Sequence, residues 1–204
     1  MFLDRDGTIN ERVEYLSDPE KFKLLPKAAE AVKLLNKADF RVIVVTNQAG
    51  VGRGYFTEEK LEEIHQEMKR QLRRKKAYIN AVYYCPHHPT EGIGKYKKNC
   101  WCRKPNPGML EKAAKDFNLD LRRCYTIGDN LSDLEVGNRV NCKTILVLTG
   151  YGKEYYANKN NWKFNIEYVA DDLLEGVKLI LREEGKYFPW KNSGALFPNS
   201  LSFN

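Results

Sequence analysis

Short apolar runs rich in β-branched residues recur along the chain, and longer segments with a helical spacing of apolar positions separate them. Such runs are typical of buried strands, and their alternation with amphipathic helices is typical of a mostly parallel sheet covered by helices on both faces. The sequence therefore predicts an α/β fold with strands at residues 1–3, 41–46, 78–84, 124–129 and 143–149.

Four of the separating segments carry the start and stop signals of helices. A proline in the first turn marks one of them, and a capping threonine marks another. The predicted helices cover residues 26–38, residues 57–77 with Thr57 as the cap, residues 107–117, and residues 171–184 with Ala170 or Asp171 near the cap.

Two stretches have no regular pattern. Residues 85–107 contain cysteines, histidines, glycines, lysines and prolines, so they form a long loop, and a loop of this length needs a function or a staple. Residues 187–204 are aromatic and contain prolines.

A chain of 204 residues can bury one good core. We expect a single domain over residues 1–186 and an irregular C-terminal tail over residues 187–204.

The composition narrows the class of protein. A net charge of +7 and a pI near 9.0 suit either a polyanionic partner or a small phosphorylated substrate in a basic cleft. The chain has neither an apolar run of membrane-spanning length nor the pattern of a signal peptide, so we expect a cytoplasmic protein without a membrane partner. In that reducing compartment, five cysteines indicate metal binding or burial rather than a disulfide framework.

Four segments carry candidate chemistry: DRDGT at residues 4–8, VVTNQAGVGRG at 44–54, RKPNPG at 103–108 and TIGDNLSD at 126–133. The first, second and fourth segments end predicted strands, and the third follows the long loop. Because the carboxyl ends of parallel strands lie along one edge of a sheet, we expect these segments to meet there. Cleavage of a phosphate ester needs an attacking oxygen, a cation and a proton donor, and these segments contain all three.

The order DxDGT, strand-Thr, Lys-Pro and GDxxxD resembles the haloacid dehalogenase (HAD) superfamily of phosphohydrolases, as far as about Gly150. The resemblance implies a Rossmann-like three-layer sandwich. It also implies that Asp4 attacks phosphorus to form an aspartyl-phosphate, and that Asp6 protonates the leaving oxygen and then activates water. Two carboxylates this close repel each other, so we expect one to accept a proton while a metal ion holds the other ionised.

The resemblance also implies a metal ion and phosphate contacts. Mg²⁺ prefers oxygen ligands, and its expected ligands are the Asp4 carboxylate, the Asp6 backbone carbonyl and Asp129. Thr46 is expected to hydrogen-bond the transferring phosphoryl group, and Lys104 is expected to neutralise its oxygens.

The long loop contains the motifs CPHH and CWC. Three thiolates and one imidazole make a tetrahedral zinc site, and four protein ligands leave no position for water, so this Zn²⁺ would staple the loop. The alternative is a set of free thiols beside a surface histidine. The zinc loop is expected over residues 85–104, with the ligands Cys85, His87, Cys100 and Cys102 and with His88 as the competing ligand.

The combination of FLDRDGTIN, TNQAGVGRG and the zinc loop resembles, within the superfamily, the D-glycero-D-manno-heptose 1,7-bisphosphate 7-phosphatases and the related histidinol-phosphate phosphatases. Neither family has a large cap domain. The resemblance implies that Arg53 and Arg103 face a second phosphate and that Asn47 contacts the substrate near the reacting one. We therefore expect removal of the 7-phosphate of the heptose bisphosphate, with histidinol phosphate or another small sugar phosphate as the alternative substrate.

Two features depart from the heptose phosphatases. Those enzymes usually have lysine after the Gly-Asp of the fourth segment, whereas this chain has Asn130, which removes a cation near the substrate. The first strand is also cut to residues 1–3. We expect that the true start lies upstream of Met1, since a strand this short would otherwise leave Asp4 on an unpaired strand and weaken the enzyme.

A function of another class is a basic zinc-containing nucleic-acid-binding protein, or its hybrid, a DNA 3′-phosphatase of the same superfamily. Tyrosine and tryptophan interleave with lysine and arginine in and beside the long loop, and such surfaces can bind single strands. No separate nucleic-acid-binding domain is recognisable. A small phosphorylated sugar is therefore the expected partner, ahead of a nucleic acid, and the protein is expected to be a monomer.

Overall fold

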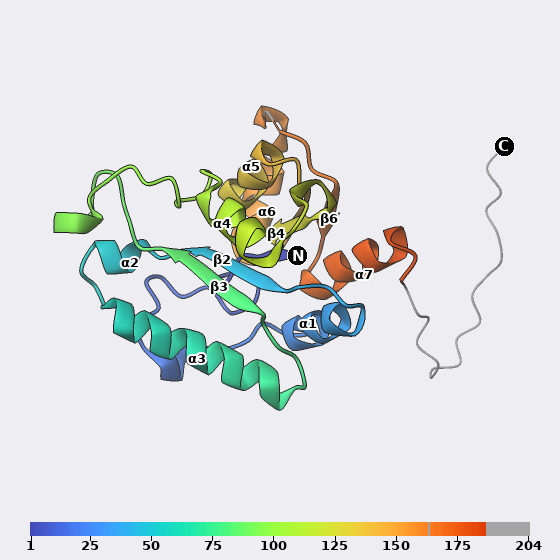
Figure 1. The fold of residues 1–204 in the computed structure, drawn as a ribbon, viewed down its shortest axis with the longest axis horizontal. Helices are drawn as coiled ribbons and strands as arrows, with labels where there is room; N and C mark the ends of the chain where they lie inside the picture. The colour runs from blue at the N-terminus through green and yellow to red at the C-terminus, as the bar shows by residue number, and fades with distance from the viewer. Residues whose placement is uncertain (163, 187–204) are drawn as a thin grey trace.

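The computed structural model describes residues 1–162 and 164–186, and the tail expected over residues 187–204 lies outside them. The strands are β1 (Phe2–Leu3), β2 (Ile43–Asn47), β3 (Ala81–Cys85), β4 (Tyr125–Gly128), β5 (Lys143–Val147) and β6 (Tyr168–Ala170). Within the described residues they form one parallel sheet in the order β3-β2-β1-β4-β5-β6 (Figure 1). The order reverses at β1, which places the start of the chain at the centre of the sheet.

Helices alternate with these strands along the chain. They are α1 (Ala28–Lys37), α2 (Ala49–Gly52), α3 (Glu58–Arg74), α4 (Gly108–Phe117), α5 (Leu131–Arg139), α6 (Gly152–Ala157) and α7 (Leu173–Glu183). Among the described residues, no helix is both long enough and apolar enough to cross a membrane.

Alternate residues of the central strands point to opposite faces of the sheet and fill two cores. Leu3 and Val44 belong to the core that contains α1, α3 and α7, whereas Phe2 and Ile43 belong to the core that contains α4 and α5. All four side chains are fully buried. Figure 1 shows α1 and α3 on one side of β2 and β3, and α4 and α5 on the other. The predicted three-layer α/β sandwich is confirmed, and the described residues include no large cap domain.

The first strand is only two residues long, but it is paired on both sides. Both of its residues pair with β2 and with β4. Beyond its ends, the Asp4 N–H donates to the Ile127 carbonyl and the Ile43 N–H donates to the Met1 carbonyl, each at 2.9 Å. The expectation that so short a strand would lack pairing is wrong, because the longer strands beside it supply partners along its whole length.

Two predicted helix starts have different outcomes. Thr57 caps α3 as expected, and its hydroxyl accepts a hydrogen bond from the Lys60 N–H at 3.2 Å. The first helix begins at Ala28, later than Pro26, because Lys27 has a left-handed backbone with φ of 64°. That conformation cannot form part of a right-handed helix.

The cap of α7 also differs from the prediction. Asp172, rather than Ala170 or Asp171, accepts a hydrogen bond from the Glu175 N–H at 3.0 Å.

Four elements, α2, α5, α6 and β6, are not predicted at all from the sequence. Each is too short for a hydrophobic period to stand out. The most consequential is α5, which begins directly after Asn130 and carries one wall of the site.

The long loop after β3 is attached to α3 by two tyrosines. The hydroxyl groups of Tyr84, in β3, and Tyr96, in the loop, each donate to the carboxylate of Glu58 at 2.6 Å. These hydrogen bonds lower the pKa of Glu58 and keep it ionised. The loop is therefore held to the body of the protein by polar contacts at its middle as well as by its two ends.

Candidate active site and cysteine cluster

The carboxyl ends of β1, β2 and β4 surround a cleft of about 410 Å³. The segments that follow these strands meet around it together with the end of the long loop, as expected for one edge of a parallel sheet. Its lining includes every residue predicted to act on the substrate: Asp4, Asp6, Thr46, Asn47, Arg53, Arg103 and Lys104. Asp129, at the end of β4, is completely buried behind this lining.

Lys104 holds the centre of the cleft. Its ammonium donates to Asp4 Oδ1 at 2.7 Å, to Asp133 Oδ1 at 2.5 Å and to the Val45 carbonyl at 2.6 Å. Burial alone would lower the pKa of Lys104, but the charges of Asp133 and Asp4 outweigh burial and raise it. The side chain is therefore a buried, permanently charged cation beside the candidate nucleophile.

Three carboxyl groups, which we call the carboxylate cluster, lie together here. Asp4, Asp129 and Asp133 each place an oxygen within 4.8 Å of the others. Burial, followed by the charges of Asp4 and Asp133, raises the pKa of Asp129 to about 8. Burial also raises the pKa of Asp133 to about 7, although Lys104 opposes it. One ammonium thus faces three acids, and the cluster is short of positive charge.

The carboxylate cluster has an oxygen that lacks a partner. Asp129 Oδ1 is buried and accepts no hydrogen bond from the described residues, whereas Oδ2 accepts one from the Tyr151 N–H at 2.9 Å. A hard divalent cation such as Mg²⁺ fits an unsatisfied, oxygen-only set of this kind. Gly7 and Gly150 pack against Asp129, and both have a positive φ, of 87° and 52°. A Cβ at either position would lie within 2.3 Å of Asp129 Oδ2, so only glycine leaves the carboxylate in place.

Asp6 is held differently from the carboxylate cluster. Arg5 donates to both of its oxygens, at 3.2 and 2.7 Å, and Asn10 and Gln48 donate at 3.0 and 2.8 Å. Burial would raise the pKa of Asp6, but the charge of Arg5 and the hydrogen bonds from Arg5, Asn10 and Gln48 together lower it. Of two neighbouring aspartates, one was expected to accept a proton. The raised pKa values in the site belong to Asp129 and Asp133, whereas Arg5, Asn10 and Gln48 stabilise the ionised form of Asp6.

Gln48 connects two of the predicted catalytic residues. Its Nε2 donates to Asp6 Oδ2 at 2.8 Å and to Thr46 Oγ1 at 2.9 Å. Neither Gln48 nor Arg5 was identified from the sequence. Arg5 lies between the two aspartates of the first motif, and Gln48 lies two residues after Thr46. Both residues therefore belong to the predicted motifs, but the sequence did not indicate which side chains they contact.

Asn47 forms a two-bond contact with the backbone of Lys104. Its Nδ2 donates to the Lys104 carbonyl, and its Oδ1 accepts from the Lys104 N–H, both at 3.0 Å. This contact fixes the backbone that carries the buried ammonium. The side chain predicted to contact substrate therefore also positions Lys104, and it still lines the cleft.

The two predicted arginines line the cleft near the long loop. Arg53 forms an ion pair with Glu91, and its guanidinium carbon lies 5.1 Å from the centre of the Tyr15 ring. Arg103 donates to the His87 carbonyl at 3.1 Å. Both arginines thus have partners in the structure, and both present charge to the cleft.

Asn130 caps a helix. Its Oδ1 accepts hydrogen bonds from the N–H and the hydroxyl of Ser132, each at 3.1 Å, at the first turn of α5. Asp133 completes a capping box by accepting from the Asn130 N–H at 3.2 Å. Asn130 is therefore engaged in local structure and brings no charge to the cleft.

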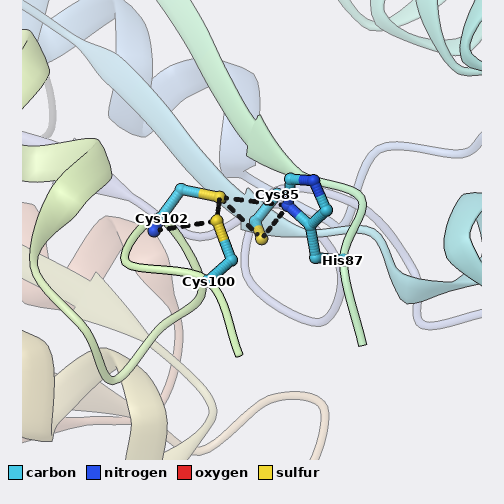
Figure 2. Close-up of side chains that lie close together, drawn as sticks. All are labelled: Cys85, His87, Cys100 and Cys102. Atoms are coloured by element: carbon cyan, nitrogen blue, oxygen red, sulfur yellow. Dashed lines mark hydrogen bonds between the residues drawn. The ribbon is translucent and has the colours of Figure 1, made fainter. Parts of the chain in front are cut away.

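The predicted zinc ligands come together at the end of β3 in a group that we call the cysteine cluster (Figure 2). Cys102 Sγ lies 2.9 Å from Cys85 Sγ, 2.7 Å from Cys100 Sγ and 3.4 Å from His87 Nδ1. One donor atom from each of the four residues lies within 4.8 Å of all the others. Three sulfurs and one imidazole at this separation fit a tetrahedral Zn²⁺.

The competing ligand, His88, points elsewhere. Its Nδ1 accepts a hydrogen bond from the Glu91 N–H at 3.0 Å, and it is not one of the four clustered residues. Burial lowers the pKa of His87, and the neutral imidazole is the form that binds a metal ion. The two remaining cysteines, Cys124 and Cys142, are buried thiols apart from the cluster.

Comparison with known proteins gives consistent matches. Residues 101–176 match the model of the HAD-hydrolase-like family. The D-glycero-D-manno-heptose-1,7-bisphosphate 7-phosphatase of Chlorobaculum tepidum is 38% identical over 183 residues, which are 87% of this chain and 91% of that protein. The D-glycero-β-D-manno-heptose-1,7-bisphosphate 7-phosphatase of Escherichia coli K12 is 38% identical over 151 residues, which are 74% and 79% of the two chains.

A solved structure has the same architecture. The D,D-heptose 1,7-bisphosphate phosphatase of B. bronchiseptica, in complex with magnesium and phosphate, aligns with a TM-score of 0.80 and 33% identity, over 90% of this chain and 98% of that one. Sequence and structure thus match the same proteins along most of their length. The chain belongs to the HAD-like hydrolases, in the family of the D-glycero-D-manno-heptose 1,7-bisphosphate phosphatases.

Proposed function

We propose that the protein is a magnesium-dependent phosphatase that hydrolyses a phosphomonoester through an aspartyl-phosphate on Asp4. One observation carries the proposal: the Lys104 ammonium bridges Asp4 and Asp133 at the floor of an open cleft, beside Asp129 with its unsatisfied oxygen. A phosphate ester is an anion that repels a carboxylate. A fixed ammonium at the nucleophile offsets this repulsion and stabilises the charge of the transferring group.

The reaction has two steps. In the first, an oxygen of Asp4 bonds to phosphorus, the ester bond to the sugar oxygen breaks, and Asp6 gives that oxygen a proton. In the second, Asp6 takes a proton from the water that attacks phosphorus and releases Asp4. Arg5 and Gln48 favour ionised Asp6, the form that the second step needs. The negative charge of bound substrate favours proton uptake before the first step.

Two metal ions have different tasks in this proposal. The Asp4 carboxylate, the Asp6 backbone carbonyl and Asp129 would hold Mg²⁺, which would supply positive charge at the transferring phosphate. Thr46 donates a hydrogen bond to that phosphate. Zn²⁺ in the cysteine cluster orders the long loop, and through Lys104, two residues after Cys102, the loop reaches the catalytic centre.

The substrate that we propose is D-glycero-D-manno-heptose 1,7-bisphosphate, cleaved at the 7-phosphate. Support comes from the relatives named above, which carry this activity in their names. Arg53 and Arg103 line the cleft and would face the second phosphate, and Asn47 would contact the substrate near the reacting one. Histidinol phosphate is the alternative substrate, because the same cleft would accept a smaller monoester.

The organisation that we propose is a monomer with one phosphatase domain over residues 1–186, acting in the cytoplasm on a small phosphorylated sugar. The single sheet over the described residues supports one domain. The five cysteines form no disulfide, which supports a reducing compartment.

The test is phosphate release with Mg²⁺ from a panel of substrates. The panel contains both anomers of the heptose bisphosphate, histidinol phosphate, fructose 1,6-bisphosphate and a 3′-phosphorylated oligonucleotide. We expect kcat/KM for one heptose anomer to exceed every other value by at least about tenfold, the effect of one good polar contact. A preference for the oligonucleotide would contradict the substrate, and no release from any compound would contradict the phosphatase.

A further inference from the structure

A further cation lines the cleft on the side of α6. Arg12, in the loop after β1, places its guanidinium carbon 3.5 Å from the centre of the Tyr151 ring, and both residues line the cleft. Stacking on an aromatic ring holds a guanidinium by its flat face and leaves the N–H groups at its edge able to donate. The Arg12 side chain is 36% exposed, so an incoming anion can reach it.

Arg12 differs from the other cations of the cleft. Its guanidinium makes no hydrogen bond to the described residues, and its nearest acid is Asp129, at 3.7 Å from Nη1 to Oδ2, beyond hydrogen-bond distance. The other cations have close partners: Arg53 with Glu91, Arg103 with the His87 carbonyl, and Lys104 with Asp4 and Asp133. Arg12 is therefore the cation with the most donor capacity left for a ligand.

Arg12 also lies beside the segment that follows β4. The Tyr151 N–H donates to Asp129, the residue that precedes Asn130, so the ring under Arg12 is attached beside position 130. Asn130 itself lines the cleft but is neutral, and it uses its side-chain oxygen to cap α5. Arg12 therefore supplies positive charge on a wall of the cleft where Asn130 supplies none.

We propose that Arg12 is a substrate-binding and specificity-determining residue, and that it binds the phosphate of the substrate that is not transferred. This inference rests on the proposed function. A guanidinium can donate two parallel hydrogen bonds to one phosphate, whereas an ammonium acts as a point charge. The pairing with Asp129 and the Tyr151 ring keeps the side chain at the cleft before substrate arrives.

The first experiment compares the heptose 1,7-bisphosphate with the heptose 7-phosphate, which lacks the second phosphate. For Arg12→Ala we expect KM for the bisphosphate to rise about tenfold or more, the effect of one lost charge-assisted contact, and KM for the monophosphate to change less than about threefold. Arg122→Ala is the matched control, because Arg122 is an exposed arginine that pairs with Asp120 and does not line the cleft. Equal increases in KM for both esters, or an equal fall in kcat for both, would overturn the proposal. Arg12 would then act on Asp129 or on the phosphate that is transferred.

A second experiment tests whether a cation on this wall of the cleft is what the bisphosphate needs. Adding Asn130→Lys to Arg12→Ala should restore at least part of the affinity for the bisphosphate, because a cation returns to the same wall. Tyr151→Leu should raise KM for the bisphosphate, whereas Tyr151→Phe, which keeps the ring, should not. Absence of rescue together with equal effects of the two Tyr151 variants would count against the proposal.

A binding measurement provides a readout that does not depend on turnover. Calorimetric titration of each protein with heptose 1-phosphate, the product that keeps the second phosphate, should show about tenfold weaker binding to Arg12→Ala than to wild type. Unchanged binding would overturn the assignment of Arg12. Failure of the proposed function has a different signature, since the wild-type protein would then release no phosphate from either heptose ester.

Discussion

The carboxylate cluster and the cysteine cluster both gather anionic ligands, but they are built in opposite ways. The carboxylate cluster comes from separate segments at the ends of β1 and β4, and it already contains a cation of the protein, Lys104. The cysteine cluster comes from the end of β3 and the loop that follows it, and its four donors are the number that a tetrahedral Zn²⁺ site needs. The first cluster lies at the substrate cleft, whereas the second lies within the long loop.

This difference shows what each metal ion can do. A cation in the carboxylate cluster completes a charge balance and leaves positions for substrate, so its removal should affect chemistry first. A cation in the cysteine cluster holds together a loop without a hydrophobic core of its own, so its removal should affect folding first. The two clusters meet in one segment, because Lys104 follows Cys102 by two residues.

The largest expected effect is the loss of the nucleophile. Asp4→Asn keeps the shape of the side chain but removes its charge, and we expect activity to fall by about 10⁴-fold or more. The fold should persist, as judged by circular dichroism, because β1 stays paired on both sides. The control is Asp171→Asn, an exposed aspartate outside the cleft. Residual turnover above about 1% of wild type would remove Asp4 as the nucleophile.

The next effect concerns the cation inside the carboxylate cluster. Lys104→Met leaves Asp4 and Asp133 without their shared partner, and we expect kcat to fall by about 10²- to 10³-fold. The free energy of unfolding should fall by about 3 kcal/mol at pH 7, since unpaired buried charges remain. Lys104 opposes the effect of burial on Asp133, so the raised pKa of Asp133 should rise further in the variant. Acids with raised pKa values destabilise the fold as pH rises, so part of the stability should return at pH 5.

Denaturant unfolding at both pH values checks this prediction. Lys112→Met is the control, because Lys112 forms an exposed pair with Asp116 four residues along the same helix. A loss of stability in Lys104→Met that is the same at pH 5 and pH 7 would contradict the electrostatic account.

Substitutions in the cysteine cluster should reduce the stability of the fold more than they reduce catalytic activity. Cys100→Ser should lower the zinc content below one per chain and reduce the free energy of unfolding by about 2 kcal/mol or more. Cys142→Ser changes a buried thiol outside the cluster and should leave the zinc content unchanged. Metal analysis and thermal unfolding provide the measurements. Stoichiometric zinc in the Cys100 variant would remove that ligand from the set.

The smallest expected effect is on pH dependence. Gln48→Leu removes one hydrogen bond each from Asp6 and Thr46, and we expect kcat to fall by about tenfold. The donors around Asp6 lower its pKa, so removing one should raise it. Activity that needs ionised Asp6 is lost as pH falls through this pKa. The acidic limb of the pH profile should therefore move to higher pH, and an unmoved limb would separate Gln48 from Asp6.

The sequence predicted the layout of the fold, two members of the carboxylate cluster (Asp4 and Asp129) and all four members of the cysteine cluster, because each depends on local signals. Strand ends carry the motifs, parallel strands bring their ends to one edge, and Thr57 caps α3 where its spacing predicted. The cysteine and histidine spacing also predicted a cluster that the structure brings together. These inferences needed only neighbouring residues and the geometry of a parallel sheet.

The partners of the site residues could not be predicted, because they depend on contacts between distant segments. Lys104 reaches Asp4 across 100 residues of sequence, and Gln48 reaches Asp6 across 42. The pKa of Asp6 is lowered because the charge of Arg5 and the hydrogen bonds from Arg5, Asn10 and Gln48 together outweigh burial. The expectation that the short first strand would be unpaired was wrong for the same reason, because its partners, β2 and β4, lie far along the chain.

The contact between Asn47 and the backbone of Lys104 has a consequence for how this architecture can evolve. The position of Lys104 is fixed by β2 on one side and by the nearby Cys102 on the other. The part of the loop between His87 and Cys100 can therefore change its length or composition without moving the ammonium. Since that part contributes Glu91, the partner of an arginine in the cleft, related enzymes can diverge in substrate choice there while the chemistry stays constant.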